Sequence, residues 1–453
     1  MDNTVRTGTE LLWSALGGDP ALVDRVEFGG VSGLLPARLP VMDLARGAVA
    51  ACSLAAVEHA GLPGPVRVDD GAVATAFVSE RHLRVDGRAP VSFAPLSRFW
   101  RAADGWVRTH ANYPHHKAAL LAALGVPDTV EAVAAAIGER PAVETETAVY
   151  AAGGLAVALR TPGEWAAGEQ GREVAARPLL TRERLDEAPA RGRGRTGPLR
   201  VLDLTRVIAG PVATRTLALL GADVLRIDPP GNPELPDQHA DAGVGKRTSA
   251  LDLDRPSDRR TFDELLDAAD VLVTGYRPGA LDRFGLGRPG LVTARLSAWG
   301  DYGPWGGRRG FDSLVQVATG IAVTEGSAEE PGALPAQALD HGTGYLLAAA
   351  VLRSLTEQRA EGGSRLVSLA LAQTGHWLTH ALPRYEPERY VTESRGPLGH
   401  LRHALSPVSY EGGPADWWGR RGRAGGGRRA PARPPAGGHR DVGAGRRVRD
   451  VTA

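Results

Sequence analysis

Residues 199–228 contain Leu199-Arg-Val-Leu-Asp-Leu204, then Thr-Arg-Val-Ile-Ala-Gly-Pro over residues 205–211, and finally Asp223-Val-Leu-Arg-Ile227. The first and last runs are short and mostly apolar, which is typical of buried strands, and residues 212–220 between them have helical character. Strand, helix and strand at this spacing predict a right-handed βαβ unit in a parallel sheet. Ligands of such sheets bind at the carboxyl ends of the strands.

Further strands are expected at residues 271–274 and 292–297, with a helix over 258–269. The sequence therefore predicts an α/β fold in which a Rossmann-like parallel sheet is joined to a smaller α/β domain. Residues 186–198 combine Pro, Gly and Arg without apolar periodicity, as a linker does. We expect this linker to separate a unit over residues 1–185 from a unit over residues 199–411.

The last segment, residues 412–453, is rich in Gly, Arg and Pro and has no periodicity. Such a composition buries too little apolar surface to fold, so it predicts disorder, although an out-of-frame end would give the same composition. A basic tail could pair with phosphates. Nucleic-acid binding is nevertheless not the favoured reading of this chain.

The whole chain has 453 residues, 43% of them hydrophobic, and its 53 Lys and Arg nearly balance its 52 Asp and Glu. Its single cysteine, Cys52, excludes an internal disulfide and a multi-cysteine metal site. Neither a signal peptide nor an apolar run of about 18 residues is recognisable. We expect a cytoplasmic protein that does not enter a membrane.

A weak internal repeat relates two parts of the chain. Asp43 and Gly47 precede an Ala-rich apolar stretch and a strand pattern, and Asp340 and Gly344 do the same. This predicts a shared unit of one helix and one strand. Only the second copy follows a βαβ region, so Asp43 is expected to be a structural helix cap.

Asp340 is the strongest candidate for catalysis from the residues themselves. It lies in Gln337-Ala-Leu-Asp-His-Gly-Thr-Gly344, before an apolar helix. A carboxylate in a glycine-rich segment at a helix start is well placed to act as a nucleophile. Asp is also a favoured N-cap, so a purely structural role remains open at this point.

Common cofactor and hydrolase signatures are missing from the sequence. The turn after the strand at 201–204 is not G-x-G-x-x-G, and neither a Walker loop nor a G-x-S-x-G elbow occurs. His115 and His116 have no carboxylate or cysteine at metal spacing and are interpreted as a solvated turn. No metal site is predicted.

Seven stretches then follow in one order between residues 199 and 378. They are residues 201–211, residues 219–228, Gly245-Lys-Arg247, Leu251-Asp-Leu253, residues 276–285, Gly310-Phe-Asp312 and Ala338-Leu-Asp340. Together they resemble the family III CoA-transferases, the group that includes formyl-CoA transferase and carnitine CoA-transferase.

The resemblance implies transfer of CoA from an acyl-CoA to a carboxylic acid, through an enzyme-bound anhydride and an aspartyl-CoA thioester on Asp340. CoA or its thioester would then be a substrate rather than a resident cofactor. The family pattern places the CoA-binding positions on Ile208, Ala209, Leu251, Asp252, Leu253, Asp254, Gly275, Tyr276, Arg277, Arg283, Arg309, Gly310, Phe311 and Asp312. Among these, the arginines would pair with phosphates.

The first half of the chain also resembles this family, in an unusual order. Residues 99–107, 151–154 and 160–165 resemble the small domain that normally follows the catalytic helix, whereas here they precede the βαβ region. The chain thus resembles the back part of one unit joined to the front part of another. The implied assembly is a homodimer or an intramolecular pseudo-dimer.

Some positions depart from the family pattern. Pro229 and Ile208 replace an arginine and a glutamine of formyl-CoA transferase, so that enzyme's donor specificity does not carry over. Related 2-methylacyl-CoA racemases have a histidine base where Phe311 stands, which favours transferase over racemase. A racemase-like enzyme, a CoA-ester lyase and an inactive CoA-binding pseudoenzyme remain the alternatives.

Overall fold

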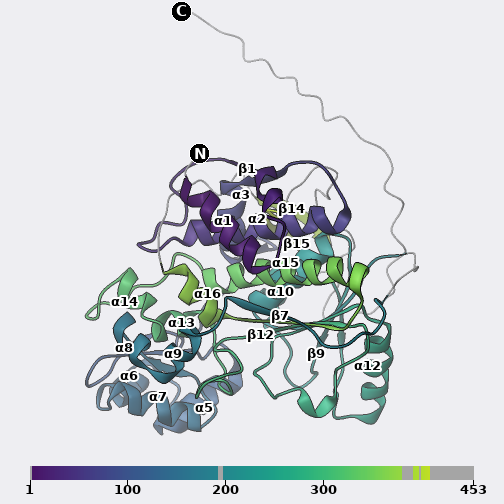
Figure 1. Ribbon diagram of the computed structural model, residues 1–453. Helices are drawn as coiled ribbons and strands as arrows, with labels where there is room; N and C mark the ends of the chain where they lie inside the picture. The colour runs from purple at the N-terminus through teal and green to yellow at the C-terminus, as the bar shows by residue number, and fades with distance from the viewer. Residues whose placement is uncertain (1–2, 192–196, 380–390, 397–398, 409–453) are drawn as a thin grey trace, which may run out of the picture.

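A seven-stranded sheet crosses the middle of the molecule in the order β10-β9-β8-β11-β12-β13-β7 (Figure 1). Its first six strands are mutually parallel, and only β7 pairs antiparallel, with β13. This confirms the predicted parallel α/β sheet. The strands are β7 (Leu180–Arg184), β8 (Arg200–Leu204), β9 (Asp223–Asp228), β10 (Arg247–Ala250), β11 (Val271–Thr274), β12 (Val292–Ser297) and β13 (Arg365–Ala370).

The computed structural model describes residues 3–191, 197–379, 391–396 and 399–408. The tail for which the sequence predicts disorder, residues 412–453, lies outside these ranges.

Three helices are stacked over one face of the sheet, and α12 (Pro256–Ala268) lies on the opposite face (Figure 1). The stack consists of α10 (Ala209–Leu219), α15 (Ala338–Glu361) and α2 (Val41–Ala60). Helix α15 lies between the other two, and every residue from Ala338 to Leu355 is buried. Residues 345–352 of α15 are apolar on every side of the helix, as is typical of a helix that is covered on several sides.

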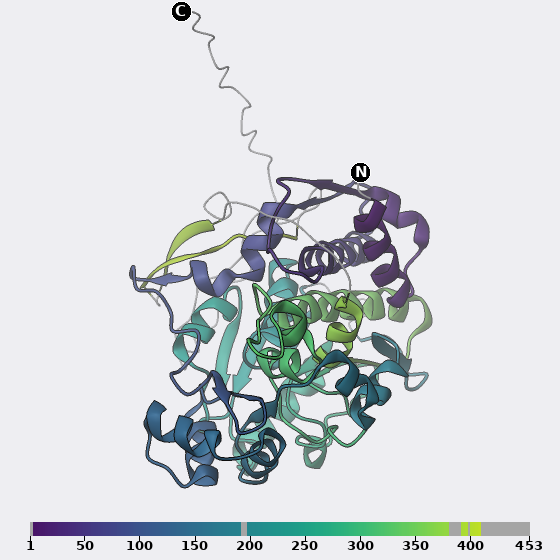
Figure 2. The same cartoon turned by 90° about the vertical axis from the view of Figure 1, so that its left-hand side faces the viewer.

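Helix α2 and its neighbours form the N-terminal part of the chain, which lies above α15 in Figures 1 and 2. The two helices of the predicted repeat, α2 and α15, pack against each other. The other elements of this part are α1 (Asn3–Ala15), η1 (Pro20–Arg25), β1 (Val26–Gly29), β2 (Val66–Asp69), α3 (Asp70–Phe77), α4 (Ser79–His82) and β3 (Arg84–Val85). Asp43 lies in the first turn of α2, where it pairs with Arg46 at 3.5 Å, and the N-cap is Pro40. The expectation that Asp43 caps the helix was therefore wrong.

A small domain follows, seen at the bottom of Figure 2. Its three-stranded antiparallel sheet and three helices enclose a hydrophobic cluster of their own. Its elements are β4 (Phe99–Arg101), β5 (Trp106–Thr109), β6 (Ala156–Ala158), α5 (Pro114–Leu124), α6 (Val130–Gly138) and α7 (Ala142–Ala151).

The remaining elements complete the described part of the chain. They are α8 (Pro162–Ala167), α9 (Glu169–Ala175), α11 (Pro236–Ala242), η2 (Asp282–Phe284), α13 (Asp312–Ala318), α14 (Ile321–Glu325), α16 (Leu371–Leu378), β14 (Val391–Gly396) and β15 (Gly399–Ala404). No helix among the described residues is long and apolar enough to cross a bilayer.

The two halves of the chain share one core and one sheet. The largest hydrophobic cluster includes Leu12 and Leu44 from the first half together with Leu346 from the second. Strand β7, which precedes the predicted linker, forms the edge of the main sheet beside β13. The described segments before and after residues 186–198 therefore pack against each other extensively.

Candidate active site

A cavity of about 270 Å³ lies at the carboxyl ends of β8, β11 and β12. Arg206 and Val207 follow β8, Gly275 follows β11 and Ala298 follows β12, and all four line the cavity. This is the edge of a parallel sheet where ligands are expected. Asp340 lines the same cavity from the first turn of α15.

Asp340 is buried, with 6% of its surface exposed. Burial, followed by the charges of Asp312 and Glu80, raises the pKa of Asp340 well above its usual value. The N-cap of α15 is Gln337, so Asp340 is not the capping residue. Helix capping therefore does not explain why this carboxyl group is buried.

Asp312, at the start of α13, is hydrogen-bonded to the main chain of Asp340. Its Oδ2 accepts the main-chain N–H of Asp340 at 2.9 Å, and its Oδ1 accepts Nε2 of Gln316 at 2.5 Å. Burial raises the pKa of Asp312 to about 6, although these hydrogen bonds and Arg108 oppose the rise. Because the charge of Asp312 also raises the pKa of Asp340, the two buried carboxyl groups do not both ionise easily.

The positions that the family resemblance assigns to CoA fall into two groups. Those that line the cavity with Asp340 are Ala209, Gly275, Tyr276, Arg277, Arg309, Gly310 and Phe311. Those outside its lining are Ile208, Leu251, Asp252, Leu253, Asp254, Arg283 and Asp312. In the second group, the exposed Arg283 pairs with Asp254 at 2.9 Å.

A larger cavity of about 620 Å³ extends along the sheet from β11 to β7. It does not include Asp340, but it shares Tyr276, Arg277, Leu296 and Ser297 with the smaller cavity. Arg277 therefore lies where the two cavities adjoin.

The small domain supplies a wall of the smaller cavity that sequence reasoning missed. Tyr113, His115 and His116 line it, and His116 is only 4% exposed. The interpretation as a solvated turn was wrong, because both histidines belong to α5 and only His115 is exposed. Pro114 is the first residue of α5, a position that proline favours, and it was the available sequence signal.

His116 is uncharged in this wall, and both of its ring nitrogens are buried without a hydrogen-bond partner in the part of the chain that the structure describes. Burial, followed by the charges of His115 and Arg309, lowers the pKa of His116 to about 3. Close by, the ring of His110 stacks on Phe311 with centroids 3.7 Å apart. Among the described residues, no group of three potential ligands is arranged to hold a metal ion.

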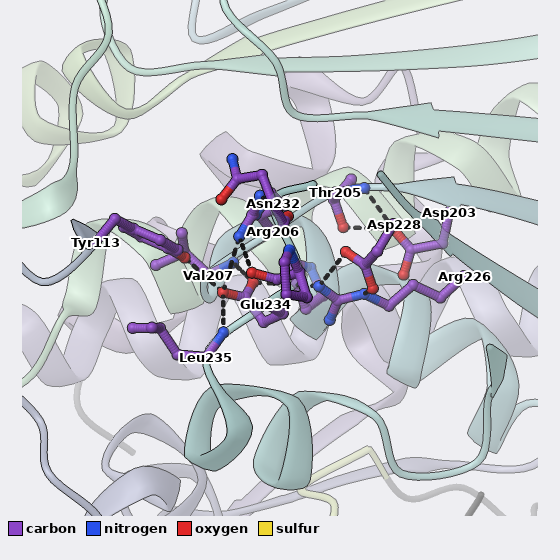
Figure 3. Close-up of polar contacts among 12 residues, drawn as sticks. Tyr113, Asp203, Thr205, Arg206, Val207, Arg226, Asp228, Asn232, Glu234 and Leu235 are labelled. Atoms are coloured by element: carbon purple, nitrogen blue, oxygen red, sulfur yellow. Dashed lines mark hydrogen bonds and ion pairs between the residues drawn. The ribbon is translucent and has the colours of Figure 1, made fainter. Parts of the chain in front are cut away.

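Behind the turn after β8 lies a buried ion pair. Lys246 Nζ contacts Asp203 Oδ2 at 2.9 Å and Thr214 Oγ1 at 2.6 Å, and both charged side chains are completely buried. Burial lowers the pKa of Lys246 to about 8, although Asp203 opposes the fall. Asp203 also accepts the N–H of Thr205 at 2.9 Å, so it fixes the start of this turn (Figure 3).

The second half of the chain is similar to known proteins. Residues 198–410 match the model of CoA-transferase family III, which confirms the resemblance over this region. The acetyl-coenzyme A transferase nodX of Hypoxylon pulicicidum is 34% identical over 45% of this chain and 37% of its own length. The probable fatty acyl-CoA transferase Rv3272 of Mycobacterium tuberculosis is 33% identical over 38% of this chain and 49% of its own length.

A crystal structure of Rv3272 superposes on 40% of this chain and 55% of its own, with a TM-score of 0.37 and 33% identity. The chain thus spans about half the length, or less, of these relatives.

Proposed function

Because residues 198–410 match CoA-transferase family III, we propose that this protein transfers CoA from an acyl-CoA to a carboxylic acid, with Asp340 as the nucleophile. The observation that carries the proposal is the buried carboxylate of Asp340 in a cavity at the carboxyl ends of the parallel strands. A carboxylate with a raised pKa is a stronger nucleophile once ionised than an ordinary one.

The proposed reaction conserves the acyl activation. The Asp340 carboxylate attacks the thioester carbonyl, the C–S bond breaks, and an anhydride and CoA thiolate result. The thiolate attacks the aspartyl carbonyl of the anhydride, which releases the donor acid and leaves an aspartyl-CoA thioester. The acceptor carboxylate attacks the carbonyl of this thioester, the C–S bond breaks, and a second anhydride and CoA thiolate result. The thiolate then attacks the acyl carbonyl of this anhydride, which gives the new acyl-CoA and frees Asp340.

The cavities suggest where CoA binds. The smaller cavity, at about 270 Å³, is below the usual range for ligand pockets of about 300–1,000 Å³, so it suits the thioester end and the acceptor acid. The adjoining cavity of about 620 Å³ has room for more of the CoA molecule. We assign phosphate binding chiefly to Arg277, where the cavities meet, and to Arg309.

We further propose that one chain supplies both walls of this site. Tyr113, His115 and His116 come from the small domain, and Asp340 comes from the region that matches the family model. This favours the intramolecular pseudo-dimer over a site shared between two chains. A cytoplasmic location stays a prediction.

A racemase-like activity is the second candidate, because His116 and Asp340 line one cavity. A base and an acid on two sides of a substrate are what exchange of an α-proton requires. The pKa of His116, about 3, makes it a weak base, so transfer of CoA is the better-supported function.

The test is to incubate the purified protein with a panel of acyl-CoA esters, record its intact mass and map any adduct. We expect a CoA-sized adduct on Asp340, lost in Asp340→Asn and retained in Asp43→Asn, the matched position of α2. A folded protein that forms no adduct but exchanges solvent deuterium into an acyl-CoA would instead be racemase-like.

A further inference from the structure

Val207 has a backbone conformation that its side chain disfavours. Its φ is +68°, in the left-handed region, where a β-branched residue is a rare outlier. Strain of this kind persists only where the surrounding structure holds it, and it is concentrated at functional sites. Val207 lines the cavity that contains Asp340.

The group that holds Val207 is the carboxylate of Glu234 (Figure 3). Glu234 Oε2 accepts the N–H of Val207 at 2.8 Å and pairs with Arg226 at 3.2 Å. Burial alone would raise the pKa of Glu234, but Arg226 and Arg206 lower it overall. Glu234 is therefore a buried, charged acceptor that pairs with two arginines and also holds the strained turn.

The same carboxylate also binds a residue of the small domain that lines the cavity. The hydroxyl of Tyr113 donates to Glu234 Oε1 at 2.5 Å, across 121 positions of sequence. Tyr113 precedes α5, and it lines the cavity together with His115 and His116. Glu234 thus ties the small domain to the turn that follows β8.

This turn is also packed tightly against the helix of Asp340. Residues 206–208 lead directly into α10, which begins at Ala209. Gly344, one turn beyond Asp340, lies so close that a Cβ there would be 2.6 Å from the carbonyl oxygen of Ala209. A shift of the backbone in this turn would therefore also displace the start of α15, because the two are closely packed.

We infer that Glu234 is a positioning residue for catalysis: by holding Val207 at positive φ and Tyr113 by its hydroxyl, it sets Asp340 and the small-domain wall at their working separation. This inference rests on the proposed function. It does not require Glu234 to touch a substrate.

The test is a double-mutant cycle with Glu234→Gln and Val207→Gly, read out as kcat/KM for CoA transfer. Gln keeps the size of Glu, but its amide nitrogen cannot accept a hydrogen bond, so Gln cannot accept from both Val207 and Tyr113. We therefore expect Glu234→Gln to lower kcat/KM by about tenfold or more. Glycine adopts positive φ without strain, so it needs no partner to hold the turn. In the Val207→Gly background, the loss caused by Glu234→Gln should shrink to about threefold or less.

Two further variants separate positioning from a general loss of stability. Glu357→Gln removes a carboxylate that pairs with Arg182 and Arg353 near the other end of α15. If Glu357→Gln lowers kcat/KM, Val207→Gly should not reduce that loss. Tyr113→Phe should lower kcat more than it changes KM for the acyl-CoA, because the wall shifts while the phosphate contacts stay.

Equal losses from Glu234→Gln in both backgrounds would overturn the inference. If the wild-type protein forms no adduct, the proposed function fails by itself. The same four proteins of the cycle are then compared by urea unfolding. A fall in the unfolding midpoint caused by Glu234→Gln that Val207→Gly relieves would support the role of Glu234 in holding the turn, and an unrelieved or absent fall would overturn it.

Discussion

The main-chain N–H of Asp340 donates to the carboxylate of Asp312 at 2.9 Å, so one buried carboxyl group supports the helix turn that carries another. The first N–H groups of a helix have no partner within the helix, and here a residue of α13 satisfies one of those of α15. The arrangement places negative charge beside the proposed nucleophile. It therefore supports the position of Asp340 while opposing its ionisation.

Removing the charge of Asp340 should stabilise the protein at neutral and alkaline pH. Its folded-state pKa is raised by burial, Asp312 and Glu80, so the folded state binds the proton more tightly than the unfolded state. The resulting penalty is absent below the unfolded pKa, grows as pH rises from the unfolded to the folded pKa, and is complete above the folded pKa. Urea unfolding of Asp340→Asn should show a higher midpoint than wild type at pH 8, with the difference vanishing near pH 4. A lower midpoint at pH 8 would contradict the burial argument.

Formation of the adduct should be slow in acid and faster as pH rises, because only ionised Asp340 attacks a thioester. Asp312→Asn removes a neighbouring negative charge that raises the pKa of Asp340. Stopped-flow measurement of the first half-reaction should therefore give a midpoint at lower pH for this variant. An unchanged midpoint would mean that Asp340 does not titrate in this step.

Arg277 and Arg309 should contribute to the binding of acyl-CoA through its phosphates. A hydrogen bond to a charged group contributes about 1.5–3 kcal/mol, so Arg277→Gln and Arg309→Gln should each raise KM about tenfold or more. The control is Arg67→Gln, an exposed arginine of β2 whose side chain pairs with Glu27 at 3.4 Å. Steady-state kinetics at low and physiological salt would check this, and equal effects in all three variants would refute it.

Lys246→Met should destabilise the protein strongly, because it leaves Asp203 buried without its cation. Breaking such a pair costs about 3–5 kcal/mol, whereas replacing both partners with apolar residues is far less costly. Urea unfolding should therefore show a large loss for Lys246→Met and a partial recovery when Asp203→Leu is added. The recovery should be incomplete, since Asp203 also accepts bonds from Thr205 and Thr214. A loss below about 1 kcal/mol for the single variant would show that the pair contributes little.

Three features of this protein follow from its amino-acid order alone: the parallel βαβ region, the placement of Asp340 at the start of an apolar helix, and the family to which residues 198–410 correspond. These features depend on local periodicity and on short motifs, which are readable along the chain. The weak repeat predicted that α2 and α15 belong to related units, but not that the two helices pack against each other.

Which residues from the two halves meet depends on the tertiary structure. The folded chain brings Tyr113 to Glu234 and His116 into the cavity of Asp340, and it makes β7 the edge of the main sheet. It also separates the positions assigned to CoA into those that line the cavity and those, such as Arg283, that pair elsewhere. These contacts join residues far apart in sequence, and they follow from the packing of whole helices and strands, for which no local pattern exists.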